Sequence, residues 1–159
     1  MDLETARRLA SEVIDKLRPY CKPERCREVG SVRRGKPLCR DVDIVLIPGE
    51  HCQGRLAMAL RGLGEAIKSG PLIHSCRYRG QQVDIYVATE ETWWTLLLIR
   101  TGSKEHNVRL CAKARSVGMK LHADGSGITL KDGVRHVPQS EEDIFAALGL
   151  PYEKPEERM

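Results

Sequence analysis

The apolar residues of the chain alternate between helical and strand spacing along its length. Helical spacing, with apolar positions three and four residues apart, predicts helices. These are residues 3–18, 53–68, 104–117 and 141–148, and residues 91–100, which are apolar nearly all round, are expected to form a buried helix. Short β-branched or alternating runs predict strands. These are residues 24–29, 41–47, 72–79, 82–88, 119–123 and 127–130. The chain therefore contains both helices and strands, which predicts a protein of mixed α and β structure.

Caps and turns separate these segments. Ser103 and Ser140 each precede a helical run and are expected to be N-caps, and Gly118 is expected to stop the helix at 104–117. Arg79-Gly80 predicts a hairpin between two strands. Gly62 and Gly64 weaken the helix at 53–68. The composition shifts near residue 90, so we expect one lobe over 1–90 and a smaller α/β C-terminal lobe over 91–159.

Composition narrows the class of protein. The 159 residues are 41% hydrophobic and 30% charged, with a net charge of +4. That charge permits a polyanionic partner without proving one. No signal peptide is visible, and no run approaches the roughly 20 apolar residues of a membrane span. We therefore expect a soluble, intracellular, cytoplasmic monomer that does not bind a membrane.

The six cysteines leave three interpretations open. Their irregular spacing favours free thiols. Cys21 and Cys26 are the local candidates for one disulfide. A metal site is the third possibility, although zinc ligands normally come in tight pairs and no second pair follows.

Acidic residues interrupt two predicted strands. Asp41 and Asp43 are two residues apart, so their side chains project from the same face of a strand, and Asp84 lies inside a second apolar run. Such carboxylates repel one another unless a cation such as Mg²⁺ lies between them. The alternative is structural: Asp41 caps the strand, and Asp43 pairs with an arginine such as Arg40.

Residues just before the first two aspartates suit an anion. Gly30 and Ser31 offer backbone N–H groups and a hydroxyl at a turn. The side chains that supply positive charge to phosphates are Arg33, Arg34, Lys36 and Arg40. Three carboxylates, a turn and arginines are the equipment of phosphoryl transfer by two metal ions.

Three motifs in order resemble the family X DNA polymerases. The first is G-S-x-R-R followed by D-x-D at 30–43 and a third aspartate at 84. The second is TGSKEHNVRL at 101–110, and the third is EEDIFAALGLPYEKPEER at 141–158. The resemblance runs from about residue 28 to 158. It implies an α+β fold, with a nucleotidyltransferase palm (a mixed β-sheet with flanking helices) over 1–90 and a small α/β, thumb-like C-terminal lobe over 91–159.

The resemblance also implies roles for individual residues. Asp41 and Asp43 would bind two Mg²⁺ ions, for which Mn²⁺ can substitute, and Asp84 would bind the catalytic ion near the primer 3′-hydroxyl. The residues implied to contact the nucleotide are Gly30, Ser31, Arg34, Arg40, Thr101, Gly102, Lys104 and Asn107. Basic residues that could hold DNA on the second lobe are Arg109, Lys113, Arg115 and Lys120; each is equally explained as a solvated charge.

Several positions depart from the family pattern. Arg40 stands where a relative has glycine, and Gln82 replaces an arginine that often accompanies the third aspartate. Ile99-Arg100 replaces an aromatic pair at the sugar-discriminating turn, and Cys111 replaces an arginine that contacts the template. About 29 residues precede Gly30, so we expect a minimal form without the family's lyase and helix-hairpin-helix domains, and no deoxyribose-phosphate lyase activity.

The expected function is a DNA-directed DNA polymerase that adds dNTPs to primer-template or gapped DNA and fills short gaps in repair. One alternative is a template-independent or ribonucleotide-tolerant nucleotidyltransferase, which Ile99-Arg100 and Cys111 favour. Another is a non-polymerase nucleotidyltransferase module.

Overall fold

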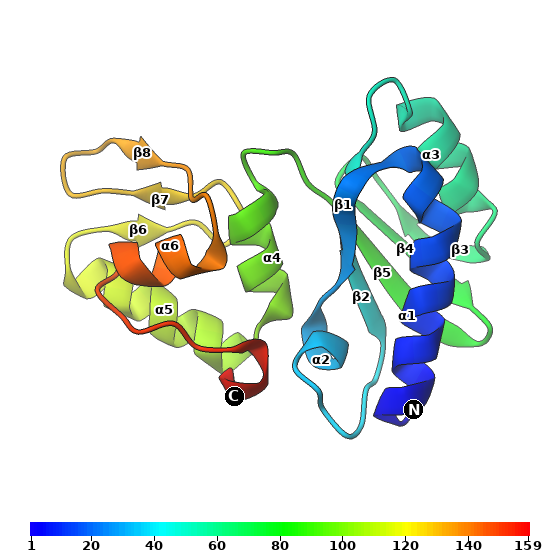
Figure 1. Cartoon of the computed structure of the whole chain (residues 1–159), viewed down its shortest axis with the longest axis horizontal. Coiled ribbons are helices and arrows are strands. Elements are labelled where there is room, and N and C mark those ends of the chain that lie inside the picture. The colour runs from blue at the N-terminus through cyan, green and yellow to red at the C-terminus, as the bar shows by residue number, and fades with distance from the viewer. The chain divides into compact units, whose positions relative to one another are not determined.

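The computed structural model describes residues 1–159, and it divides into two compact units, Met1–Thr89 and Glu90–Met159. Unit 1 contains α1 (Leu3–Leu17), α2 (Gly30–Arg33), α3 (Gln53–Arg61) and five strands. Unit 2 contains α4 (Trp93–Thr101), α5 (Lys104–Ser116), α6 (Glu141–Ala147) and three short strands. Figure 1 shows these elements in chain order. The predicted mixture of helices with a mixed sheet is confirmed.

The sheet of unit 1 runs in the order β1-β2-β5-β4-β3. Its strands are β1 (Cys21–Glu28), β2 (Val42–Pro48), β3 (Glu65–Ser69), β4 (Ile73–Tyr78) and β5 (Gln81–Val87). The central strands β2 and β5 are parallel, and every other neighbouring pair is antiparallel. A parallel pair at the centre needs crossover connections, which α3 and the outer strands β3 and β4 supply.

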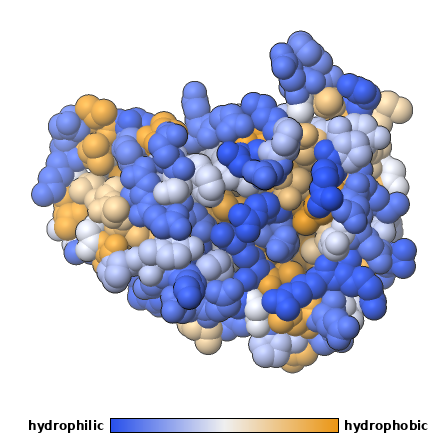
Figure 2. Space-filling model, viewed as in Figure 1, coloured by the Kyte–Doolittle hydropathy of each residue, from blue (hydrophilic) through white to orange (hydrophobic).

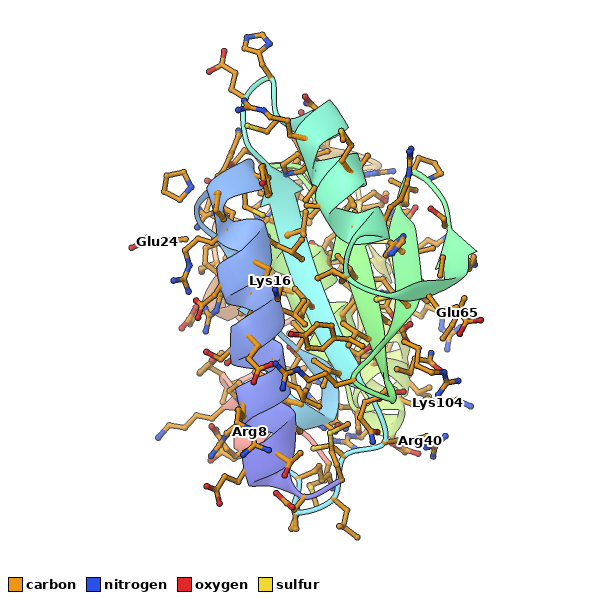
Figure 3. The ribbon with its side chains drawn as sticks, turned by 90° about the vertical axis from the view of Figure 1, so that its right-hand side faces the viewer. Arg8, Lys16, Glu24, Arg40, Glu65 and Lys104 are labelled. Carbon is orange, nitrogen blue, oxygen red and sulfur yellow. The ribbon has the colours of Figure 1, made fainter.

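Two helices cover one face of this sheet. α1 and α3 lie on the same side of the strands (Figure 3), and their apolar side chains pack with alternate residues of the central strands. Val42, Ile44 and Leu46 of β2 belong to this core and are fully buried, as are Val83 and Ile85 of β5. The intervening positions of both strands, Asp43 and Asp84 among them, therefore project from the opposite face.

Unit 2 has its own apolar core. Three strands, β6 (Lys120–Leu121), β7 (Ile128–Thr129) and β8 (Arg135–His136), form an antiparallel sheet in that order. Leu98 of α4, Leu110 of α5 and Phe145 of α6 pack together with residues of this sheet. No helix of the chain is long and apolar enough to cross a membrane. The face drawn in Figure 2 is mostly hydrophilic, with apolar side chains scattered across it.

The predicted helix at 53–68 is wrong in its second half. α3 stops at Arg61 with Gly62 as its C-cap, and residues 65–69 form the edge strand β3. A Cβ on Gly64 would overlap the Arg77 carbonyl of β4, so the chain needs glycine where it joins the sheet. The apolar spacing that favoured a helix is overridden by this pairing.

Other boundaries differ less. β1 begins at Cys21 rather than at residue 24, β8 was not expected, and the extended tail contains a short 3₁₀ turn at Pro155–Glu157. The predicted N-caps are confirmed: Ser103 accepts a hydrogen bond from the His106 N–H, and Ser140 accepts one from the Asp143 N–H. The hairpin at Arg79-Gly80 is also confirmed, and both residues have positive φ, at 48° and 78°.

Candidate active site

The two strand aspartates lie side by side on the face of the unit 1 sheet opposite to α1 and α3. Asp43 of β2 and Asp84 of β5 are register partners in the parallel pair, which puts their side chains on the same face of neighbouring strands. Asp84 is 9% exposed and Asp43 is half-buried. Two adjacent carboxylates in a low-dielectric setting repel each other, so the arrangement calls for positive charge.

Asp41 is close to Asp43 in sequence but lies outside β2. It is half-buried in the bend before β2 begins at Val42. The structure gathers no three acidic, histidine or cysteine side chains into a group that could hold a metal ion. The structure therefore brings together two of the three predicted metal ligands and places the third just outside the strand.

Gly30 brings the backbone against Asp43. The Val29 N–H donates to the Asp43 carbonyl over 2.8 Å, which ties the end of β1 to β2 at this residue. Gly30 has a φ of +61°, and a Cβ at this position would overlap the Asp43 carboxylate. Only glycine satisfies both conditions. The segment 30–34 is thus held directly beside the carboxylate pair.

Polar groups that follow Gly30 suit an anion. The Ser31 hydroxyl is buried and has no hydrogen-bond partner, which is costly unless a ligand completes it. Arg34 follows α2 as its C-cap and is half-buried. Arg40 lies in the loop before β2 and is exposed, with its side chain directed away from the ribbon (Figure 3).

Two neutral donors flank Asp84 on β5. The Gln82 amide Nε2 lies 3.1 Å from both oxygens of the Asp84 carboxylate. The Tyr86 hydroxyl donates to Asp43 Oδ1 over 3.4 Å. Because side chains alternate along a strand, residues 82, 84 and 86 share one face. This alternation was a signal available in the sequence, but it identified neither contact in advance.

The donor set fits a hard divalent cation. Carboxylate oxygens are the ligands that Mg²⁺ and Mn²⁺ prefer, and the register pair supplies two carboxylates from rigid strands. The Ser31 hydroxyl, buried and without a hydrogen-bond partner, lies in the segment that Gly30 holds against the Asp43 carboxylate. Asp43 and Asp84 are the residues that could hold such an ion, with Asp41 adjacent.

In unit 2, the predicted nucleotide-contacting residues occupy the junction of α4 and α5. Thr101 and Gly102 are buried, and the Thr101 hydroxyl donates to the Leu97 carbonyl over 2.6 Å. The Gly102–Ser103 peptide bond is cis. The Asn107 amide donates to the Ile99 carbonyl over 2.8 Å, while its Oδ1 is buried without a partner. Asn107 therefore joins the two helices and still has an unused acceptor.

The predicted DNA-binding side chains are not all on one face. Arg109 and Lys113 are one helical turn apart on α5, whereas Arg115 is turned about 120° away from Arg109. Lys104 begins α5 and is exposed, and Lys120 is exposed on β6. The Arg109 guanidinium donates to the Met159 carbonyl over 3.1 Å, so part of its bonding capacity is used within unit 2.

The C-terminal motif forms a buried ion pair in unit 2. Arg158 is 0% exposed and donates to both carboxylate oxygens of Glu141, over 3.1 and 3.2 Å. Its guanidinium also lies over the rings of Phe145 and Tyr152. The buried His106 ring lies 2.9 Å from Glu153, and burial lowers the pKa of His106 below its ordinary value. This network fixes the tail against α5 and α6.

Comparisons with known proteins agree with this architecture. Residues 96–159 match the family model of the DNA polymerase beta thumb. The chain is 28% identical over 158 residues to the DNA polymerase/3′-5′ exonuclease PolX of Bacillus subtilis (strain 168), covering 96% of this chain and 27% of the relative. It is 30% identical over 162 residues to DNA polymerase lambda of Rattus norvegicus, covering 84% of this chain and 28% of the relative. The chain thus spans little more than a quarter of these relatives.

A solved structure shows the same fold. A crystal structure of Leishmania infantum polymerase beta, a ternary P/T complex, superimposes with a TM-score of 0.82 at 24% identity. The superposition covers 100% of this chain and 76% of that one. This likeness shows the fold, and the thumb match together with the two polymerase relatives supports a place for the chain among the family X DNA polymerases.

Proposed function

We propose that the chain catalyses DNA-directed addition of dNTPs to a primer 3′-hydroxyl, and that it fills short gaps in DNA. The observation that carries this proposal is the register pair Asp43–Asp84, set on rigid strands against Gly30. The family relationship supports a nucleotidyl transfer reaction. The matched structure of L. infantum polymerase beta is a ternary P/T complex, which supports a DNA substrate for this chain.

Unit 1 would hold the catalytic metal ions and the triphosphate. Asp41, Asp43 and Asp84 would hold two Mg²⁺ ions, which when bound acidify the primer hydroxyl and offset charge on the leaving pyrophosphate. The Ser31 hydroxyl would donate to a phosphate oxygen and so gain the partner it lacks. Arg34 would add a charge-assisted hydrogen bond, and the exposed Arg40 would add another.

Gln82 would act on Asp84 rather than on the substrate. Its amide contacts both carboxylate oxygens, which limits rotation of the carboxylate about its last bond. Asp84, so oriented, would accept or direct the proton of the primer hydroxyl. A neutral amide leaves the negative charge of Asp84 intact, whereas an arginine would offset it.

Unit 2 would contribute contacts to the nucleotide and DNA. The unused Asn107 Oδ1 is an acceptor for a base or sugar edge, and the exposed Lys104 supplies positive charge beside it. Arg109 and Lys113 would contact phosphates from one face of α5, with Arg115 and Lys120 on other faces. Phosphate contacts of this kind supply affinity without sequence preference.

Primer extension on a one-nucleotide gap with Mg²⁺ tests the proposal. The wild-type chain should add a single templated dNTP. Asp43→Asn and Asp84→Asn should each abolish incorporation, because each removes a ligand charge while keeping the side-chain shape. Asp15→Asn, on the exposed surface of α1, is the matched control and should extend primers normally. Normal extension by either active-site variant would refute the assignment.

Ribonucleotide tolerance is a second candidate property. Ile99 and Arg100 stand at the end of α4 beside Thr101 and Gly102, where family members carry an aromatic pair. The Cys111 thiol points to the Leu121 carbonyl within unit 2, at 3.8 Å, so no charged side chain is supplied for the template there. The same assay with rNTPs, and with single-stranded primers, separates this property from strict template-directed DNA synthesis.

A further inference from the structure

Cys21 and Cys26 are the first and sixth residues of β1 but lie close together in the sheet. Cys21 pairs with Pro48 of β2 and Cys26 pairs with Leu46, so five steps along β1 match only two steps along β2. The intervening residues 22–25 bulge outward, with Glu24 at a φ of +61° and its side chain projecting from the ribbon (Figure 3). Partners two residues apart on one strand project from the same face.

The bulge therefore sets the two thiols side by side. Two positions two residues apart on a strand are separated by about 6.6 Å, within the Cα spacing of roughly 4.4–6.8 Å that a disulfide requires. The two thiols hydrogen-bond to each other, and the Cys21 Sγ also donates to the Leu17 carbonyl over 3.2 Å. Both cysteines are half-buried free thiols.

The surroundings of the two thiols shift their pKa values in opposite directions. The hydrogen bond from Cys26 lowers the pKa of the Cys21 thiol, and the same bond together with burial raises the pKa of Cys26. Cys26 also lines a cavity of about 290 Å³ between α1 and β1, alongside Arg7, Ser11 and Arg18. The cavity gives a small reagent a path to the Cys26 side of the pair. Glu28 also lines it, and its charge opposes the effect of Arg18 on the pKa of Cys26.

We propose that Cys21 and Cys26 form a redox-active dithiol that a low-molecular-weight disulfide, such as oxidised glutathione, converts to an intramolecular disulfide. The Cys21 thiolate attacks one sulfur of the reagent, forms a mixed disulfide and releases the first thiol. The Cys26 thiol then loses its proton and attacks the Cys21 sulfur, which forms the Cys21–Cys26 bond and releases the second thiol. The reagent gains the two electrons that the two cysteines lose.

The dithiol lies at the far end of the β1–β2 pair from the candidate active site. Cys21 pairs with Pro48 at one end, whereas Glu28 pairs with Ile44 next to Asp43 at the other. Oxidation is thus expected to constrain the bulge and the start of β1 without altering the carboxylates. The proposal does not depend on the polymerase assignment.

Mass spectrometry of the full chain tests the proposal. The reduced protein is incubated with oxidised glutathione, quenched with acid, labelled with a maleimide and digested with trypsin. We expect the intact mass to fall by about 2 Da and the protein to take up two fewer maleimides. Trypsin cuts after Arg25 but not before Pro19 or Pro23, so the disulfide should join peptide 17–25 to the dipeptide 26–27.

Matched variants make the outcome decisive. Cys21→Ala and Cys26→Ala should each abolish the linked peptide and leave glutathione on the remaining cysteine, whereas Cys52→Ser should form it as the wild type does. Recovery of both wild-type peptides with maleimide labels would overturn the proposal. So would separate glutathione adducts on the two cysteines, or linkage of either cysteine to another thiol. The wild-type result stands even if an alanine variant fails to fold.

Discussion

Removal of the Arg158 charge should destabilise unit 2 severely. Arg158 is fully buried and makes three hydrogen bonds, two to the Glu141 carboxylate at 3.1 and 3.2 Å and one to the Glu153 carbonyl at 3.0 Å. Arg158→Met keeps most of the side-chain volume against Phe145 but removes the guanidinium that pairs with the Glu141 carboxylate, which is itself 3% exposed. Breaking a buried pair in this way costs about 3–5 kcal/mol.

That loss is large for a unit of this size. A unit of about 70 residues has a free energy of unfolding of roughly 4–10 kcal/mol. Arg158→Lys should cost less, about 1–3 kcal/mol, because the positive charge remains while the bidentate hydrogen bonding to Glu141 is lost. Replacing both partners, as Arg158→Met with Glu141→Leu, should recover most of the stability, since neither charge of the buried pair then remains.

Urea unfolding followed by tryptophan fluorescence measures these differences. Trp93 and Trp94 are the only tryptophans of the chain and both lie in α4, so the signal reports on unit 2. Arg115→Met, on an exposed position of α5, is the control and should change the free energy of unfolding by less than about 0.5 kcal/mol. A loss below about 1 kcal/mol for Arg158→Met, or a double variant as unstable as the single one, would refute the reasoning.

Three further predictions concern the two units. Gly30→Ala should destabilise unit 1 by about 1–2 kcal/mol in chemical unfolding and abolish incorporation, because the methyl group would overlap Asp43 at a positive φ; normal activity would contradict the role given to Gly30. Gln82→Leu should slow incorporation about tenfold or more by freeing Asp84, and Gln82→Asn, too short to reach, should behave similarly; an unchanged rate would remove Gln82 from the site. Burial lowers the pKa values of His74, His106 and His122, so the unfolded chain takes up protons at a pH where the folded chain does not. The free energy of unfolding should therefore be highest above pH 6.5 and should fall as the pH drops below that value, and His106→Gln should weaken this pH dependence. A free energy of unfolding that rises on acidification would contradict this prediction.

Local chemistry explains what the sequence predicted well. Serine N-caps, the positive-φ hairpin at Arg79-Gly80 and the strongly periodic helix at 3–18 depend on neighbouring residues, and each appears in the structure at or near its predicted bounds. β3 depends instead on pairing with β4, which is remote from the spacing pattern within 53–68. Tertiary pairing overrode the helical spacing there, as it commonly does for short segments.

The candidate site likewise combines features that the local sequence predicts with features that depend on tertiary pairing. Alternation within one strand was enough to predict that Asp41 and Asp43 project from one face, and the apolar run around Asp84 marked a second acidic residue within a strand. The adjacency of Asp43 and Asp84 depends on the parallel register of β2 and β5, which no local pattern encodes. The close approach of Gly30 to Asp43, and the contact of Gln82 with Asp84, also follow from strand order.

The most direct test of the central claim, that Asp43 and Asp84 form a metal-dependent nucleotide site, is a Mn²⁺ titration in the presence of a dNTP, followed by electron paramagnetic resonance of the free ion. The wild-type chain and Asp15→Asn should bind Mn²⁺ equally, because Asp15 is exposed on α1. Asp43→Asn and Asp84→Asn should each bind it at least about tenfold more weakly, since each removes a carboxylate charge from the register pair. Equal affinity in all four proteins would contradict the account.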